Sequence, residues 1–444
     1  MTRRSVLPRF VLVGALAAAF LAGLGVKHVA AAARHGAAPP YRPLDVFAEV
    51  LEKVENDYVE DVGEQELVYG AIDGIMGRLD PHSAFMRPEV YRQLREDTTG
   101  EFDGLGIEVA AKDGALVVVA PLADSPGERA GIRPGDRILA IDGAATKDMA
   151  AAEAIRRMKG PAGTRVVLDV MREGFTAPQA LALVRDRVRT QSIDMRVLDA
   201  ERRYAYVRVK AFQERTDRSL RKALDDARAE LHGELGGLVL DLRNNPGGLL
   251  DQAVRVADLF LSSGVIVTTE GRARRDVQIE KAREKETEPS YPMIVLVNKG
   301  TASASEIVAG ALQDHGRAVI MGTRTFGKGS VQTIVELEDG SGLKLTVARY
   351  YTPRHRSIQE KGIAPDVVVG EVAPVVAADS APGEKDLAGH LRNDSAPEAT
   401  SGGQDRAGPV AEDHPLRTAV DYLRAVDILK ASAQQPPGMA AKRE

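Results

Sequence analysis

The sequence predicts a mixed α/β protein of several units, and three changes of pattern along the chain indicate it. Apolar residues recur at helical spacing from about 44 to 98, which predicts two or three helices. Short β-type segments separated by glycines follow from about 100 to 188. From 189 to 370, unbroken apolar runs alternate with helical segments, a pattern typical of an α/β domain with buried strands.

Composition excludes several classes of protein. The 444 residues are 44% hydrophobic and 28% charged, which is a globular mixture and excludes a wholly disordered chain. The net charge is −5, aromatic residues make up only 4%, and tryptophan is absent, so we expect no nucleic-acid partner. The absence of cysteine excludes disulfides, a thiol nucleophile and cysteine-based metal centres.

The N-terminus has the pattern of an export signal. Arg3, Arg4 and Arg9 precede an uncharged apolar run from Phe10 to Val26. This run is at the lower limit of what spans a bilayer, so residues 1–35 form either a cleaved signal peptide or a retained membrane anchor. Basic residues before the run place the N-terminus inside the cell. We therefore expect an exported protein, in a bacterial periplasm or on the outer face of the inner membrane.

The C-terminal part differs in composition from the body of the chain. Residues 371–415 are rich in Ala, Pro, Gly, Ser, Asp and Glu, which predicts a disordered linker. Apolar residues at helical spacing from 416 to 432 then predict a terminal helix.

The segment 100–188 resembles a PDZ domain. The Gly104-Leu105-Gly106-Ile107 loop, the Ala130–Asp136 turn and the Ile141-Asp142-Gly143 turn carry this resemblance. A single Gly-x-Gly-Ile would be an ordinary turn, but the whole series is more specific. Backbone N–H groups in such a loop can bind the C-terminal carboxylate of a peptide, and the neighbouring strand edge can pair with that peptide.

Within the α/β segment, five apolar runs predict strands and three segments predict helices, and a late pair of runs predicts a hairpin across residues 339–342. The expected strands are Tyr206–Val209, Leu238–Leu242, Val265–Thr269, Met293–Val297 and Ala318–Met321, the helices 217–231, 249–261 and 305–314, and the hairpin strands Val331–Leu337 and Leu343–Tyr351.

Thr301–Ile307 comes after a predicted strand. It begins as a tight turn of small residues and continues as a predicted helix. A serine on that turn lies at a helix N-terminus, where the helix dipole and free N–H groups favour developing negative charge. The alternative is that these serines are ordinary N-caps, as Ser305 followed by Glu306 suggests.

A serine needs a base, and Lys328 is the candidate because it lies between two glycines, 25 positions after Ser303. A desolvated lysine has a lowered pKa and can accept a proton, whereas a solvated loop lysine cannot. In a third segment, Leu240–Leu249, a strand again runs into a glycine turn and a helix, and the amides of Gly247 (or Gly248) and Ala304 could hold an oxyanion. The alternative for this turn is a simple helix start.

These segments together resemble the carboxyl-terminal processing protease family of tail-specific serine peptidases, over residues 44 to 370. The Leu79–Ser83 turn belongs to the resemblance. It implies that Ser303 is the nucleophile, Lys328 the general base and Gln332 a residue that supports the lysine. It also implies a catalytic domain with the fold shared by crotonase and Clp peptidase, an inserted PDZ domain that presents the substrate, and no cofactor or metal.

The implied function is an endopeptidase that processes or degrades exported proteins from their C-terminal tails. Protein substrates with apolar C-termini are the expected partners, and the sequence leaves open an adaptor protein and a homo-oligomer. An unoccupied PDZ domain that blocks the active site is a further hypothesis from the same resemblance.

Three other interpretations compete with this one. A Ser-His-Asp hydrolase lacks its Gly-x-Ser-x-Gly elbow, although His82 and His315 are chemically plausible bases. A nucleotide-binding loop from Gly322 to Lys328 has Gly329 where a Mg²⁺-binding hydroxyl is needed. A catalytically inert PDZ scaffold of the cell envelope is the third, and the presence of both Ser303 and Lys328 argues against it.

Overall fold

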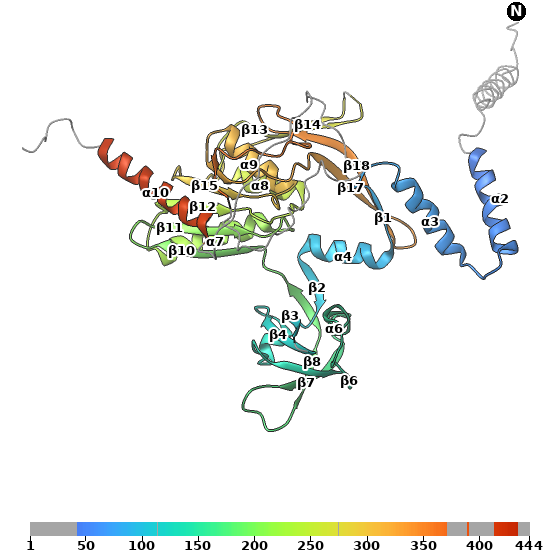
Figure 1. The fold of residues 1–444 in the computed structure, drawn as a ribbon. Helices are drawn as coiled ribbons and strands as arrows, with labels where there is room; N and C mark the ends of the chain where they lie inside the picture. Colours follow the sequence, from blue (N-terminus) through green and yellow to red (C-terminus); the bar gives the residue numbers. More distant parts are fainter. Residues whose placement is uncertain (1–41, 113, 274, 371–388, 390–412, 434–444) are drawn as a thin grey trace, which may run out of the picture. The chain divides into compact units, whose positions relative to one another are not determined.

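The computed structural model describes residues 42–112, 114–273, 275–370, 389 and 413–433 (Figure 1). The expected signal or anchor at 1–35 and almost all of the expected linker lie outside the described residues. The chain divides into two compact units, Met1–Ile75 and Met76–Glu444. Among the described helices, none has both the length and the apolar content to cross a bilayer.

The expected N-terminal helices are present. Helix α2 spans Arg42–Asp57, α3 spans Glu64–Met76 and α4 spans Pro88–Thr99. Helix α4 has a proline in its first turn and ends at Gly100, whose φ of 69° is left-handed. Proline at the start and glycine at the end are the residues most often found at these helix positions. The turn predicted at Leu79–Ser83 separates α3 from strand β1 (Ala84–Met86).

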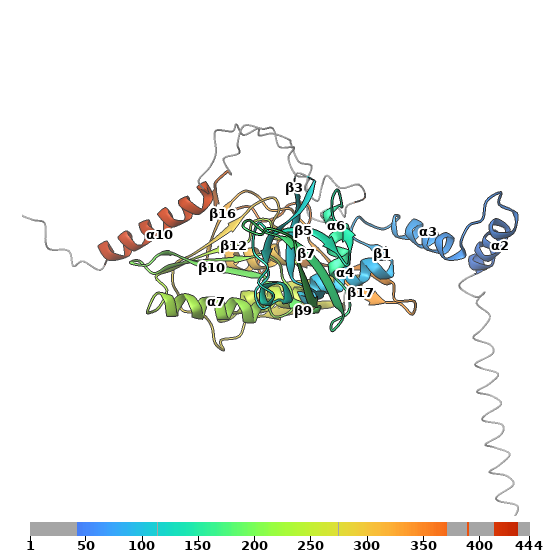
Figure 2. The same cartoon turned by 90° about the horizontal axis from the view of Figure 1, so that it is seen from below.

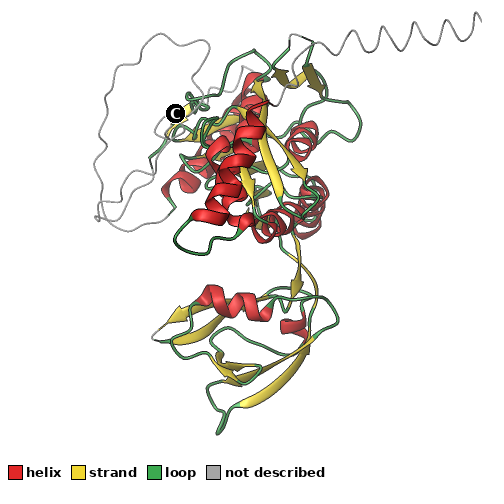
Figure 3. Ribbon diagram, turned by 90° about the vertical axis from the view of Figure 1, so that its right-hand side faces the viewer, coloured by secondary structure: helices red, strands yellow, loops and turns green. Residues whose placement is uncertain are grey.

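The glycine-punctuated segment folds as a small antiparallel sheet with one main helix, coloured by secondary structure in the lower part of Figure 3. Its core joins sheet residues such as Leu116, Ile138 and Leu168 to Ala154 and Met158 of the helix. A two-stranded ribbon carries the chain into and out of this segment. The elements are β2 (Glu101–Gly104), β3 (Ile107–Lys112), β4 (Ala115–Pro121), α5 (Pro126–Arg129), β5 (Arg137–Ile141), β6 (Ala144–Ala145), α6 (Ala151–Met158), β7 (Arg165–Met171), β8 (Gln179–Val184) and β9 (Asp186–Arg189).

A six-stranded sheet forms the centre of the α/β part, in the order β10-β11-β12-β15-β16-β19. The β10–β11 pair is antiparallel and the other pairs are parallel. Every residue of β12 and β15 is buried, as their unbroken apolar sequences predict. The strands are β10 (Ile193–Asp199), β11 (Tyr204–Val209), β12 (Gly237–Asp241), β15 (Met293–Val297), β16 (Val319–Gly322) and β19 (Val367–Val368).

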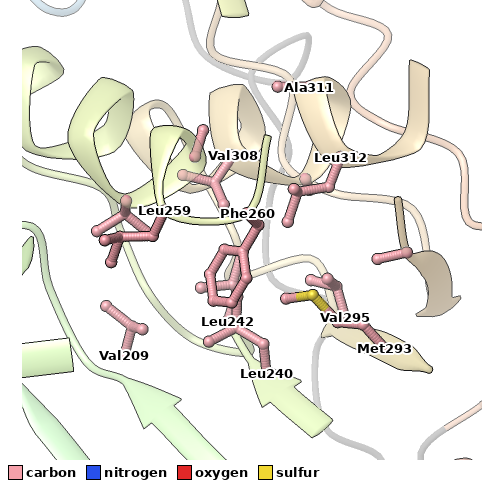
Figure 4. Packing of buried hydrophobic residues seen from close by; sticks show 14 of the residues in the cluster. Val209, Leu240, Leu242, Leu259, Phe260, Met293, Val295, Val308, Ala311 and Leu312 are labelled. Carbon is pink, nitrogen blue, oxygen red and sulfur yellow. The ribbon is translucent and has the colours of Figure 1, made fainter. Parts of the chain in front are cut away.

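Helices cover both faces of this sheet. Alternate residues of a strand point to opposite faces, so a strand that is apolar at every position needs packing partners on both sides. Leu238, Leu240 and Val295 belong to the cluster packed against α7 (Thr216–Glu230), α8 (Leu250–Asp258) and α9 (Ala304–Asp314), which Figure 4 shows in part. Val239 and Leu296 face the other way, toward α10 (His414–Ala433). The expected terminal helix therefore docks on the sheet face opposite α7, as Figure 2 shows.

A second, antiparallel sheet carries the late hairpin. Its order is β1-β18-β13-β14, with β17 paired to β18. The hairpin expected at 331–351 is confirmed, with Glu336 opposite Gly342 at its turn. Strand β13, expected in the α/β alternation, pairs instead with β14 and β18. The strands are β13 (Val265–Gly271), β14 (Val277–Lys281), β17 (Ser330–Glu336) and β18 (Gly342–Tyr351).

Candidate active site

Ser303 lies on a sharp turn immediately before α9. Its φ of 55° and ψ of −117° are unusual for a residue with a side chain. Such backbone strain persists only where surrounding contacts impose it, and it concentrates at functional sites. The residue is half-buried, and the helix that follows places its N-terminus at this point.

The neighbouring serine has a different environment. Ser305 is fully buried, and its hydroxyl donates to the carbonyl oxygen of Asn245 at 3.0 Å. The hydroxyl of Thr301 donates to the carbonyl oxygen of Leu242 at 2.8 Å. Ser305 and Thr301 therefore fasten the turn to the loop after β12, which leaves Ser303 as the serine available for chemistry.

The carboxylate of Glu306 joins the Ser303 turn to the Lys328 loop. Its Oε2 accepts the backbone N–H of Ser303 at 2.8 Å and that of Lys328 at 2.9 Å. Its Oε1 accepts the backbone N–H of Gly327 at 2.8 Å and the hydroxyl of Thr325. One oxygen atom thus holds the main chain of both predicted catalytic residues, which fixes their separation.

Glu306 is completely buried. Burial raises its pKa from 4.5 to about 7, because the loss of water outweighs the four hydrogen bonds that favour the carboxylate. The sequence does not predict that the Glu306 carboxylate joins the Ser303 turn to the Lys328 loop. Its only signal in the sequence is the Ser-x-x-Glu spacing of a capping box, of which the Glu306 side chain makes the reverse half.

The loop that carries Lys328 is held from several sides. Tyr350 donates its hydroxyl to the carbonyl oxygen of Lys328, and the backbone N–H of Gly329 donates to Gln359 Oε1 at 2.9 Å. The amides of Gly327 and Lys328 already bind a carboxylate of this chain. A phosphate would have to displace it, which argues against the nucleotide-loop interpretation.

Gly247 lies directly against Ser303. A side-chain carbon added at Gly247 would be 2.9 Å from Ser303 Cβ and 2.9 Å from the backbone nitrogen of Ala304, so no larger residue fits. Its φ of 102° also favours glycine. The structure therefore brings Gly247, Ala304 and Ser303 together. The N–H of Gly247 donates to Asn245 Oδ1 at 2.9 Å, a contact within its own loop.

The structure places Gln332 on β17, opposite Thr346 of β18. Its Nε2 donates to Ser330 Oγ at 2.9 Å and to Thr346 Oγ1 at 3.2 Å. The side chain is therefore restrained near the start of the strand that follows Lys328.

An ionic network that the sequence did not reveal lies behind the glycine loop. Arg243 binds Asp241 and makes two bonds of 2.7 Å to Asp413, just before α10. Tyr206 donates to Asp241 at 2.8 Å, and burial followed by the Asp241 charge raises the tyrosine pKa to about 12. The network connects the terminal helix to the strand end that leads into the loop at Gly247.

The PDZ-like segment has a groove between β3 and α6. Three of the four predicted loop residues, Leu105, Gly106 and Ile107, line a cavity of 360 Å³, whereas Gly104 ends strand β2 outside that lining. The cavity is mostly apolar, with Val119, Ile155 and Met158 completing it among others. The hydroxyl of Ser125 donates to the carbonyl oxygen of Gly106 at 3.1 Å and holds the loop.

A serine on a strained turn at a helix N-terminus, together with an apolar groove in a PDZ-like segment, fits a serine peptidase with a PDZ domain. The model of peptidase family S41 matches residues 203–369, the PDZ domain model matches 117–172, and the model of the activating protease CtpB N-terminal domain matches 27–90.

Relatives in sequence agree with this class. The chain is 44% identical to the carboxy-terminal-processing protease of Bartonella bacilliformis over 82% of its length and 83% of the relative. It is 37% identical to the carboxy-terminal processing protease CtpA of Bacillus subtilis, over 73% and 68% of the two chains. The solved photosystem II D1 C-terminal processing protease is 32% identical, covers 76% and 97%, and has a TM-score of 0.42. The chain belongs to the carboxyl-terminal processing protease family, and it is a serine protease.

Proposed function

We propose that the protein cleaves exported polypeptides from their C-terminal tails with a Ser303–Lys328 dyad. The observation that carries the proposal is the Glu306 carboxylate, whose one oxygen binds the backbone of both residues. A shared anchor of this kind keeps a nucleophile and its base in register, as an activated serine requires.

In the proposed mechanism, the neutral amine of Lys328 accepts the proton of the Ser303 hydroxyl while the oxygen attacks the peptide carbonyl. The N–H of Ala304, at the start of α9, and the N–H of Gly247 stabilise the oxyanion. Gly247 must exchange its bond to Asn245 Oδ1 for the oxyanion. Lys328 then protonates the leaving amine, and water hydrolyses the acyl-enzyme.

In this proposal the PDZ groove selects the substrate. Its apolar lining supports binding of an apolar C-terminal side chain, and the backbone of the Leu105–Ile107 loop would receive the terminal carboxylate. The basic, apolar N-terminus supports export to the periplasm or the outer face of the inner membrane. Peptide binding to the PDZ domain would then shift a population of blocked enzyme toward an open one.

The test is cleavage of an unstructured protein with an apolar C-terminus, followed by mass spectrometry. Ser303→Ala and Lys328→Ala are each expected to abolish cleavage. The matched controls Ser262→Ala and Lys299→Ala, both at exposed loop positions, are expected to retain it. Undiminished cleavage by either dyad variant would overturn the site assignment.

A further inference from the structure

Asp80 follows α3 in the tight turn that leads into β1, and its carboxylate collects four hydrogen bonds. The backbone N–H groups of His82 and Ser83 donate to it at 2.9 and 3.0 Å. The Ser83 hydroxyl donates at 2.7 Å and the Thr346 hydroxyl at 3.0 Å. Burial opposes ionisation, but these bonds outweigh it and lower the pKa of Asp80, so the group is a carboxylate at neutral pH.

An ionised carboxylate only accepts hydrogen bonds, and this fixes the direction of the whole network. The single hydroxyl proton of Ser83 points to Asp80 at 2.7 Å rather than to Thr346 Oγ1 at 3.3 Å. The hydroxyl proton of Thr346 also points to Asp80. Thr346 Oγ1 can therefore act only as an acceptor toward Gln332, whose Nε2 lies 3.2 Å away.

The amide of Gln332 consequently has one orientation. Both Nε2 protons are used, one by Thr346 and one by Ser330 Oγ at 2.9 Å, so the carbonyl oxygen Oε1 is the group left for another partner. The strands hold this arrangement in register. Gln332 pairs with Thr346 between β17 and β18, and Ala84 pairs with Lys344 two residues before Thr346.

We propose that Asp80 is a positioning residue of the peptidase, which acts through Thr346 to present the Gln332 carbonyl oxygen to the amine of Lys328. The inference rests on the proposed function, in which Gln332 supports the lysine. An acceptor at that place binds an N–H of the amine and leaves the nitrogen lone pair for the Ser303 hydroxyl. A flipped amide would instead donate to that lone pair and block proton transfer.

The decisive variant is Thr346→Val, which keeps the shape of the side chain and removes the hydroxyl. We expect kcat to fall about tenfold with KM unchanged, the effect of one lost hydrogen bond on the transition state. Thr346→Ser is expected to retain activity because it keeps the hydroxyl. Thr333→Val, an exposed position on the neighbouring strand, is the matched control and is expected to behave as wild type.

A double-mutant cycle separates positioning from a merely structural role. If Thr346 acts through Gln332, the Thr346→Val/Gln332→Ala double variant is no slower than Gln332→Ala alone, and both single variants shift the pH profile of kcat in the same direction. Asp80→Asn should repeat this pattern.

Additive losses of kcat in the double variant, or an effect on KM alone, would overturn the inference. If Gln332→Ala itself retains full activity while Ser303→Ala is inactive, the inference fails and the dyad stands. Cleavage by Ser303→Ala would instead refute the proposed function.

Discussion

Replacing Glu306 by glutamine separates its charge from its shape. The glutamine carbonyl can keep the N–H groups of Ser303 and Lys328, and its amide can donate to the Thr325 hydroxyl. The N–H of Gly327 and the hydroxyl proton of Thr325 both lose their acceptor. We therefore expect Glu306→Gln to fold and kcat to fall at least about tenfold, the effect of losing one buried hydrogen bond or more. Glu306→Ala orphans three backbone donors at about 1–3 kcal/mol each, a large part of the stability of most domains.

The pH dependence of stability gives the sharper readout. The folded-state pKa of Glu306 is raised from 4.5 to about 7, so between these values the folded protein binds more protons than the unfolded chain. The contribution of Glu306 to the free energy of unfolding is then greatest below pH 4.5 and falls as the pH rises toward 7. At 1.36 kcal/mol per pKa unit, this one group removes about 3 kcal/mol across that window.

The assay is urea unfolding of wild type and Glu306→Gln from pH 4.5 to 7.5, together with kcat. The variant should gain about 3 kcal/mol relative to wild type as pH rises, because glutamine has no charge to bury. Asp314→Asn, at the other end of α9, is the control. Asp314 is buried and bound to Arg356, so its loss should lower stability without the same fall in kcat. A difference that does not change with pH would refute the account of Glu306.

Three further substitutions test the oxyanion glycine, the PDZ groove and the contact of the terminal helix. Gly247→Ala should lower kcat by at least about 10² with little change in KM, because its Cβ would lie 2.9 Å from Ser303 Cβ; steady-state kinetics check this, and a wild-type kcat would contradict it. Gly106→Ala, with φ of 64° and a Cβ 2.3 Å from that of Ser125, should weaken binding of a labelled apolar-tailed peptide at least about tenfold; unchanged anisotropy titrations would exclude the groove as the tail site. Asp413→Asn should lower the free energy of unfolding by about 1–2 kcal/mol, since Arg243 loses a partly exposed partner; an unchanged urea midpoint would show that the contact adds no stability.

The sequence predicts the central sheet well because strands that are buried on both faces appear in it as runs of apolar residues. Strand β15 and Leu238–Leu240 of β12 are continuous apolar runs, and both strands lie in the middle of the sheet. Strand β13 has the same appearance over Val265–Thr269 but joins the antiparallel sheet. A short apolar run fixes neither the direction nor the partner of a strand, so its place depends on contacts far along the chain. The exposed strand β14 has no such run and was not predicted.

The same limit applies to the active site. Local pattern identifies the turn at Ser303, and the family resemblance favours Ser303 over Ser305. The physical reason, which is the burial and hydrogen bonding of Ser305, is visible only in the structure. The link from Glu306 to Lys328 spans 22 residues, and the link from Asp80 to Thr346 spans 266. Neither spacing belongs to a helix or a hairpin. Such contacts become visible only once the two sheets are assembled.

In the proposed mechanism, Lys328 activates Ser303 for attack on a carbonyl carbon. The most direct measurement is acid-quenched mass spectrometry after mixing with a p-nitrophenyl ester of an apolar peptide. We expect one acyl adduct, on the peptide that contains Ser303, and none in folded Lys328→Ala. An adduct on another residue, or equal acylation of Ser303 without the lysine, would contradict it.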